Sequence, residues 1–216
     1  MQIVFDFDGV IINSHKIKTE AFFDVFRCYG KHIGLKAKLF HLNNIGRSRY
    51  FKFKFILKNY VKKKINKREL NQLDKNFDDI IKKKLSNLSP SKNLLKFLSK
   101  YKEKHELYIS TGTPQKKIIE ILKVKNLIRY FDRVYGSPKT KFEHIKLIRK
   151  KKSSLVFIGD SYEDYLVSKK MKVNFVLKYN SENILIRKKI DTKKINSFKN
   201  FHKYVEFLEF KNQIKA

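Results

Sequence analysis

The sequence predicts an α/β protein in which a parallel β-sheet is covered by helices and interrupted early by an all-helical segment. Three observations support this prediction. Residues 2–5 are apolar and lead directly into acidic residues, as at the end of a buried strand. Residues 15–88 carry apolar side chains at helical spacing. From residue 89 onward, short apolar runs alternate with helix-length segments, which is typical of a parallel sheet.

The first strand is expected over residues 2–5. Asp6 and Asp8 follow it, and Gly9 comes next, which favours a tight turn. We therefore expect both carboxylates at the carboxyl end of this strand.

The helical segment contains three apolar stripes with helical periodicity. They are Phe22, Phe23, Val25 and Phe26; Tyr50, Phe51, Phe53, Phe55, Ile56 and Leu57; and Leu70, Leu73, Phe77, Ile80 and Ile81. We expect residues 15–88 to form a separate helical domain, inserted into a core made of residues 1–14 and 89–216.

Strands and helices alternate along the rest of the chain. Strands are expected at 106–110, 133–135, 154–158 and 173–177, and helices at 94–98, 114–122, 141–149 and 162–170. Thr113 is expected to cap the helix at 114–122, with Pro114 at its first position. A closing helix is expected near 198–207.

The charge of the chain is strongly positive. Lys and Arg number 51 against 20 Asp and Glu, which gives a formal net charge of +31. Such a charge suits a polyanion such as nucleic acid, or an anionic membrane surface. The lysines are spread along the whole chain, however, and they accompany abundant Asn, Ile and Phe with few Gly (7) and Pro (3). This joint skew favours the composition of an AT-rich genome as the explanation.

Cysteine use and hydropathy bear on the compartment. The single Cys excludes an internal disulfide and fits a reducing compartment. The sequence shows no basic start before an apolar run, and nothing near the roughly 20 apolar residues of a membrane span. We expect a soluble cytoplasmic protein without a membrane partner, as a monomer or a dimer.

Polar side chains gather after the predicted strands, at the edge where open parallel sheets bind ligands. They are Asp6 and Asp8; Ser110, Thr111 and Gly112; Lys139 and Lys141; and Asp160, Glu163 and Asp164. Singly, such residues also cap helices or form turns. Because acidic residues are scarce in this chain, their clustering at strand ends favours a functional site.

These motifs resemble those of the haloacid dehalogenase-like (HAD) hydrolases, in the phosphatase branch. The matching stretches, in chain order, are Phe5-Asp6-Phe7-Asp8-Gly9-Val10, then Thr111, then Lys141, then Gly159-Asp160-Ser161-Tyr162-Glu163-Asp164. The first and last are specific as a pair, whereas a lone Thr or Lys is a weak signal. The resemblance implies a Rossmann-like core, and the helical insert looks like the cap domain of phosphoglycolate phosphatase and beta-phosphoglucomutase relatives.

The resemblance also implies roles for these residues. Asp6 would attack the phosphoryl group and form an acyl phosphate. Mg²⁺ would be held by the side chains of Asp6 and Asp160 and by the backbone carbonyl of Asp8. Asp164 would bind the ion through water or orient Asp160. Asp8 would act as general acid and then as general base. Thr111, helped by backbone N–H groups near Gly112, would bind a phosphoryl oxygen.

A lysine would neutralise the charge on Asp6 and the phosphate. Lys139 and Lys141 compete for this role, and the position of Lys141 at the start of a helix favours it.

Asp8 bears on the reaction, because the dehalogenases of the family lack the second aspartate. Its presence predicts phosphate-ester chemistry, but it does not separate a phosphatase from a phosphomutase. One departure from the family pattern is Asn13 before Ser14, where relatives commonly carry Asp. That position lies at the hinge to the cap and puts the admission of substrate in doubt, not the attack.

The cap is expected to select a small phosphorylated metabolite, such as a sugar phosphate or a phosphoglycolate-like compound. Arg47 and Arg49, beside Gly46, are candidates to clamp a phosphate or carboxylate, unless they are solvated or paired with acids of the cap. His15 lies just beyond the first motif, where it could face the site, but a surface position is the favoured interpretation. The alternative functions are a phosphomutase and a basic nucleic-acid-binding protein that kept the fold, and the retained acidic set argues against the latter.

Overall fold

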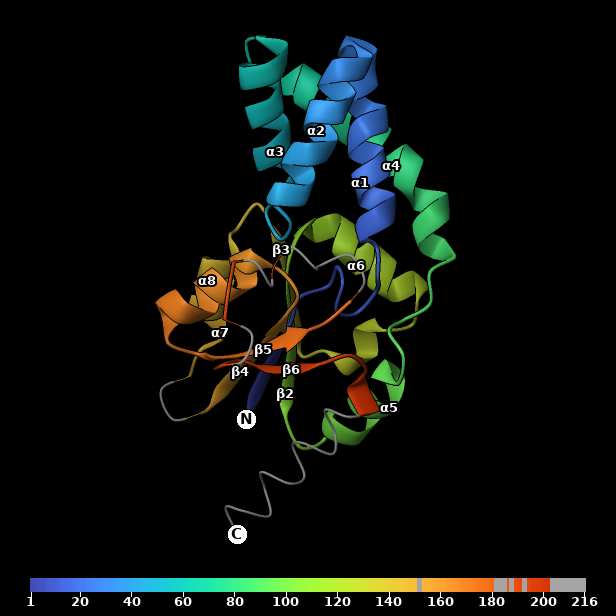
Figure 1. The fold of residues 1–216 in the computed structure, drawn as a ribbon. Coiled ribbons are helices and arrows are strands. Elements are labelled where there is room, and N and C mark those ends of the chain that lie inside the picture. Colours follow the sequence, from blue (N-terminus) through green and yellow to red (C-terminus); the bar gives the residue numbers. More distant parts are fainter. Residues whose placement is uncertain (151–152, 181–185, 187–188, 192–193, 203–216) are drawn as a thin grey trace.

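The computed structural model describes residues 1–150, 153–180, 186, 189–191 and 194–202. Within these residues, six parallel strands form one sheet in the order β3-β2-β1-β4-β5-β6. Figure 1 shows this sheet and its helices below, with a group of further helices standing on one end of it. The expected α/β class is confirmed.

The first strand lies in the middle of the sheet. The strands are β1 (Gln2–Phe5), β2 (Glu106–Pro114), β3 (Arg133–Ser137), β4 (Leu155–Gly159), β5 (Asn174–Lys178) and β6 (Asn196–Phe198). Phe5, the last residue of β1, pairs with Ile109 of β2 and with Ile158 of β4. The residues that follow Phe5, Ile109 and Ile158 therefore lie together at one edge of the sheet.

Both faces of the sheet are covered, which explains why the central strands β1 and β4 are almost entirely apolar and buried. The helices are α5 (Leu94–Tyr101), α6 (Gln115–Val124), α7 (Lys141–Ile148) and α8 (Tyr162–Met171), with a short 3₁₀ turn at Ile128–Tyr130. Ile3 and Phe5 pack with α5 and α6, whereas Val4 packs with α7 and α8. The alternation of side chains along β1 thus divides the core into two layers.

The insert is helical and has a core of its own. It contains α1 (His15–Phe26), α2 (Lys31–Asn43), α3 (Arg49–Ile56) and α4 (Lys67–Ser86), with short helical turns at Arg27–Tyr29 and Leu57–Val61. Phe22, Phe26, Phe53 and Phe77 are buried together at its centre. Most residues of the expected periodic stripes therefore face the core of this cap, whereas Phe51 is exposed.

Two expectations about local structure need correction. Thr113 does not cap a helix, because β2 runs on through Pro114 and α6 starts at Gln115. Its hydroxyl instead donates to Asp8 at 3.2 Å. The closing helix expected near 198–207 starts later than residue 198: Phe198 is the last residue of β6 (Asn196–Phe198), Phe201 and His202 are helical, and residues 203–207 lie outside the described residues.

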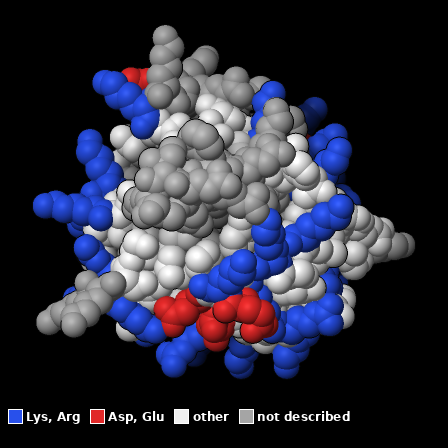
Figure 2. Space-filling model, turned by 90° about the horizontal axis from the view of Figure 1, so that it is seen from below, with Lys and Arg blue, Asp and Glu red and all other residues white. Residues whose placement is uncertain are grey.

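The surface charge is dispersed. Figure 2 shows Lys and Arg side chains at many places around the outline of the face opposite the cap, with acidic side chains gathered mainly at one side of it. No described helix is both long and apolar enough to cross a membrane.

Candidate active site

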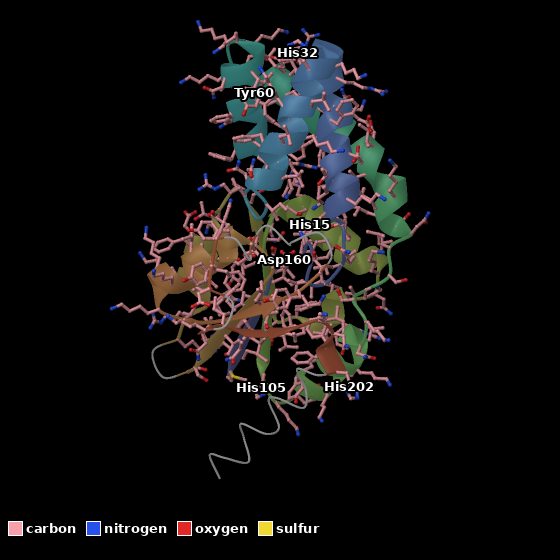
Figure 3. The ribbon with its side chains drawn as sticks, viewed as in Figure 1. His15, His32, Tyr60, His105, Asp160 and His202 are labelled. Carbon is pink, nitrogen blue, oxygen red and sulfur yellow. The ribbon has the colours of Figure 1, made fainter. Side chains whose placement is uncertain are left out.

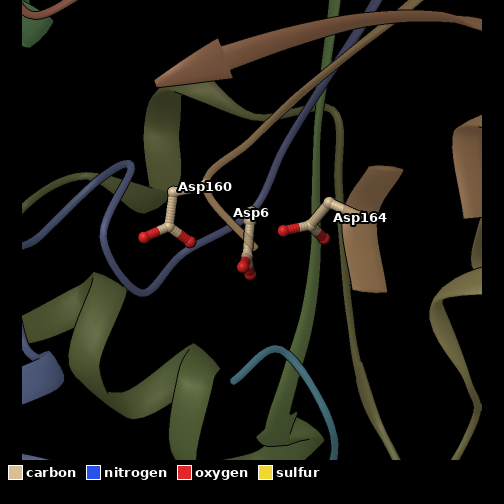
Figure 4. A group of neighbouring side chains, drawn as sticks. All are labelled: Asp6, Asp160 and Asp164. Atoms are coloured by element: carbon tan, nitrogen blue, oxygen red, sulfur yellow. The ribbon is translucent and has the colours of Figure 1, made fainter. Parts of the chain in front are cut away.

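Three carboxylates converge where β1 and β4 end. Asp6 follows β1, Asp160 follows β4, and Asp164 lies in the first turn of α8. One carboxylate oxygen from each lies within 4.8 Å of the others, and all three side chains are buried. Figure 4 shows the three groups facing a common space. A buried set of carboxylate oxygens has the donor chemistry that Mg²⁺ prefers, so the residues present fit this ion.

Lys141 supplies the balancing charge. Its Nζ lies 2.7 Å from Asp6 Oδ2 and 2.6 Å from Asp164 Oδ1. Lys141 is the first residue of α7, which a capping box between Thr140 and Glu143 fixes in place. Lys139, the rival in the sequence, is exposed.

Burial and the charges of neighbouring residues shift the pKa values of the cluster. Burial raises the pKa of Asp6 well above its usual value, Lys141 opposes this, and Asp164 and Asp160 add to it. Burial alone would lower the pKa of Lys141, but the carboxylates of Asp164 and Asp6 outweigh it and raise that pKa. The three carboxylates outnumber the ammonium of Lys141, which favours binding of a further cation.

Asp160 has two further partners. His15 Nε2 lies 2.6 Å from Asp160 Oδ2, and Asn180 Nδ2 donates to the same oxygen at 2.7 Å. Burial would lower the pKa of His15, but Asp160 outweighs burial and raises it to about 9. Figure 3 places His15 and Asp160 side by side beneath the cap.

The expectation of a surface position for His15 is therefore wrong. A single histidine after the first motif carries no spacing signal that distinguishes the two positions.

Gly9 closes the turn between Asp6 and the cap, with φ of +79°. A Cβ atom there would overlap Asp160 Oδ2 and His15 Nε2. We expect Gly9→Ala to destabilise the fold by more than about 1 kcal/mol, because positive φ and overlap act together. Urea unfolding measures this, with Gly30→Ala as the control: it has φ of +113°, and only its neighbour His32 lies near. An equal loss in both variants would show that the overlap at Asp160 does not matter.

Asp8 is held by residues that the sequence analysis did not select. Ser14 Oγ donates to Asp8 Oδ1 at 2.5 Å, and Lys18 Nζ lies 2.6 Å from the same oxygen. Burial alone would raise the pKa of Asp8, but Lys18 and Ser14 together lower it to about 2. Lys18 also donates to Thr113 Oγ1 at 3.0 Å, so this cap residue bridges the two parts of the protein.

Thr111 and Gly112 lie at the same edge of the sheet. Because Phe5 pairs with Ile109, Thr111 stands beside the start of the first motif. Thr111 is fully buried, and its Oγ1 accepts from Thr113 N at 3.2 Å. A Cβ at Gly112 would lie 2.9 Å from Gly46 O, so the cap loop that contains Gly46 packs directly against this part of β2.

The two arginines of the cap loop already have acidic partners. Arg47 Nε lies 3.1 Å from Glu163 Oε2 of the core, across the boundary between cap and core. Arg49 is buried and lies 2.6 Å from both Asp74 and Asp78 of α4. Both line the cavity described next, but neither is a free cation in this structure.

A cavity of about 330 Å³ opens between the cap and the acidic cluster. Asp6, Asp8, Gly112 and Thr113 form its floor on the core side. Its other walls include polar residues of the cap and apolar residues of α4 and α6, among them Lys18, His41, Lys52, Phe77, Ile81, Leu85 and Ile121. The arrangement gives a small ligand access to Asp6 and encloses it beneath the cap.

Fold and site together define a capped α/β enzyme with a carboxylate site at its sheet edge. A family model described as haloacid dehalogenase-like hydrolase matches residues 3–178. The chain therefore belongs to the haloacid dehalogenase-like hydrolases.

Solved structures share this fold. Beta-phosphoglucomutase of Clostridium difficile has 16% identity and a TM-score of 0.72, covering 100% of this chain and 99% of that one. A predicted phosphoglycolate phosphatase of Haemophilus somnus has 19% identity and a TM-score of 0.69, covering 96% and 97%. YfnB of Bacillus subtilis, in a form bound to magnesium, has 14% identity and a TM-score of 0.66, covering 96% and 98%. No curated protein matches the chain.

Proposed function

We propose that this protein is a magnesium-dependent phosphatase that hydrolyses a small phosphorylated metabolite through an aspartyl-phosphate on Asp6. The observation that carries the proposal is the buried group of Asp6, Lys141, Asp160 and Asp164, of which Asp6 lines the cavity. We place the cap at residues 15–88 and the core at 1–14 and 89–216.

Asp6 is the proposed nucleophile. Its Oδ1 accepts from Phe7 N at 2.7 Å, which fixes the carboxylate, and Oδ2 lies against Lys141. Attack on phosphorus forms an O–P bond and breaks the bond to the leaving oxygen. Lys141 offsets the negative charge that the phosphate adds. Bound Mg²⁺ supplies charge neutralisation between the carboxylates and the phosphate, and Asp6, Asp160, Asp164 and the Asp8 carbonyl are its proposed ligands.

Asp8 is the proposed acid and base. With its pKa at about 2 it is a carboxylate in this structure, the state that takes a proton from the water attacking the acyl phosphate. Donating a proton to the leaving oxygen requires a higher pKa. The negative charge of a bound phosphate acts in that direction.

Thr111 and Gly112 are proposed to bind the phosphoryl group. Gly112 and Thr113, near the end of β2, line the cavity, and backbone N–H groups there would suit a phosphoryl oxygen. Arg47 and Arg49 remain proposed contacts for the rest of the substrate. Each arginine would then contact the substrate and its acidic partner at the same time.

The proposal predicts phosphate release that depends on Mg²⁺. A panel of sugar phosphates, phosphoglycolate and an aryl phosphate would be assayed with Mg²⁺ and with excess chelator. We expect turnover with Mg²⁺ and a loss of at least about 100-fold with chelator, because the acidic cluster then repels the phosphate. Full activity in chelator would contradict the role of the ion. Transfer of phosphate between positions of a sugar, without release, would favour a phosphomutase.

A further inference from the structure

The cap presents one buried lysine to the cavity from α3. Lys52 is only 3% exposed, and its Nζ lies 3.1 Å from His41 Nδ1 of α2. The ring of Phe22 supports both groups: it stacks on His41 at 4.4 Å between centroids, and Lys52 Nζ lies 5.3 Å from its centre. Both contacts of the Lys52 ammonium, with His41 and with Phe22, thus lie within the cap and hold the ammonium in place.

The charge of Lys52 lacks an acidic partner among the described residues, unlike that of its neighbours. Lys18 pairs with Asp8 at 2.6 Å, and Arg49 pairs with two carboxylates of α4. Burial, followed by the positive charge of Lys18, outweighs the more distant carboxylates of Asp8 and Asp6 and lowers the pKa of Lys52 to about 7. Burying a cation without a contacting carboxylate costs free energy, and an anion bound beside the cation would offset this cost.

His41 adds a second donor. Burial, followed by the charge of Lys52, lowers its pKa well below the usual value, so its ring is neutral. Because Nδ1 accepts from Lys52, the ring proton is on Nε2. In the described part of the chain this buried Nε2 has no hydrogen-bond partner. An ammonium and an imidazole N–H side by side suit the oxygens of a carboxylate or phosphate.

We propose that the substrate is a phosphate monoester whose leaving group carries a second anionic group, bound by Lys52 and His41. This inference rests on the proposed function, because it names the substrate class of the same site. The anion at Lys52 is distinct from the reacting phosphate, which lies on the core side at Asp6. Lys18 contacts the core at Asp8 and Thr113, whereas Lys52 contacts the cap.

A matched pair of substrates tests this directly. 3-Phosphoglycerate and glycerol 3-phosphate share the reacting phosphate and differ in a carboxylate against a hydroxymethyl group. We expect the wild type to prefer the former, and Lys52→Met to lower its kcat/KM by about 10- to 100-fold while changing the latter little. Lys54→Met, an exposed lysine of the same helix, is the control and should leave both unchanged.

The same comparison with propane-1,3-diol bisphosphate and 3-hydroxypropyl phosphate shows whether the second anion is a phosphate or a carboxylate. A loss in Lys52→Met for at least one anionic substrate, and not for its neutral partner, supports the inference. Equal losses for both members of each pair would place Lys52 on the reacting phosphate and overturn it. An unchanged preference in Lys52→Met would overturn it as well.

A binding measurement separates this inference from the proposed function. Calorimetry on Asp6→Asn, with Mg²⁺, would compare binding of 3-phosphoglycerate and propane-1,3-diol bisphosphate with that of their neutral partners, before and after Lys52→Met is added. A preference that disappears with Lys52→Met supports the anion site even if the wild type hydrolyses none of these compounds. Absence of any preference in Asp6→Asn, beside hydrolysis by the wild type, overturns the anion site and leaves the phosphatase standing.

Discussion

Replacement of Asp6 by Asn is expected to lower the rate of phosphate release by at least about 10⁴-fold, because the amide cannot form the acyl phosphate. Asp6 also contributes one of the three carboxylates of the acidic cluster. The variant should nonetheless fold, since Asn preserves the shape of the side chain and relieves repulsion by Asp164 and Asp160. Phosphate release and thermal unfolding would be measured on the same preparation.

The control for Asp6→Asn is Asp132→Asn, at a carboxylate remote from the cavity. Asp132 accepts from Leu107 N at 2.7 Å, and its replacement is expected to leave the rate unchanged. An Asp6→Asn variant that keeps its fold and more than a tenth of the activity would remove Asp6 from the role of nucleophile.

Replacement of Lys141 by Met is expected to have the second largest effect. It leaves Asp6 and Asp164 buried without their cation, and loss of one partner of a buried pair costs about 3–5 kcal/mol. It also removes charge that offsets the phosphate, which lowers kcat by about 10²- to 10³-fold. Stability would be measured by urea unfolding in chelator and again with Mg²⁺, which we expect to restore part of the loss.

Lys139→Met is the matched control, two residues away on an exposed side chain. It should change the free energy of unfolding by less than about 0.5 kcal/mol and leave kcat as it is. If Lys139→Met lowered kcat and Lys141→Met did not, the assignment of the two lysines would have to be exchanged.

The sequence was sufficient to predict the strands β1 to β5, the helices α5 to α8 and the sheet edge that carries the acids, but not β6. Apolar runs that end in Asp6 and in Gly159-Asp160 identify β1 and β4, because side chains after parallel strands meet at one edge. Lys141 was preferred because it opens a helix, as the lysine of the family does, and the structure shows that a capping box between Thr140 and Glu143 starts this helix. These features depend on neighbours along the chain.

The contacts between cap and core could not be predicted from the sequence. Lys18, His15 and Lys52 lie in a helical segment rich in basic residues, where nothing local distinguishes a buried cation from a solvated one. The partners of Lys18 and His15, Asp8 and Asp160, lie 10 and 145 residues away. Thr113 was misassigned for a related reason: a Thr before Pro is typical of a helix start, but strand pairing extends β2 to Pro114.

The most direct test of the account is to trap the phosphoenzyme. Wild-type protein would be mixed with excess labelled substrate, quenched in acid during turnover, digested and mapped by mass spectrometry. The account predicts one phosphoryl group on the peptide that contains Asp6, released by hydroxylamine as an acyl phosphate and absent from Asp6→Asn. Rapid turnover with the label on another residue, or with no label while product forms in a pre-steady-state burst, would contradict the aspartyl-phosphate.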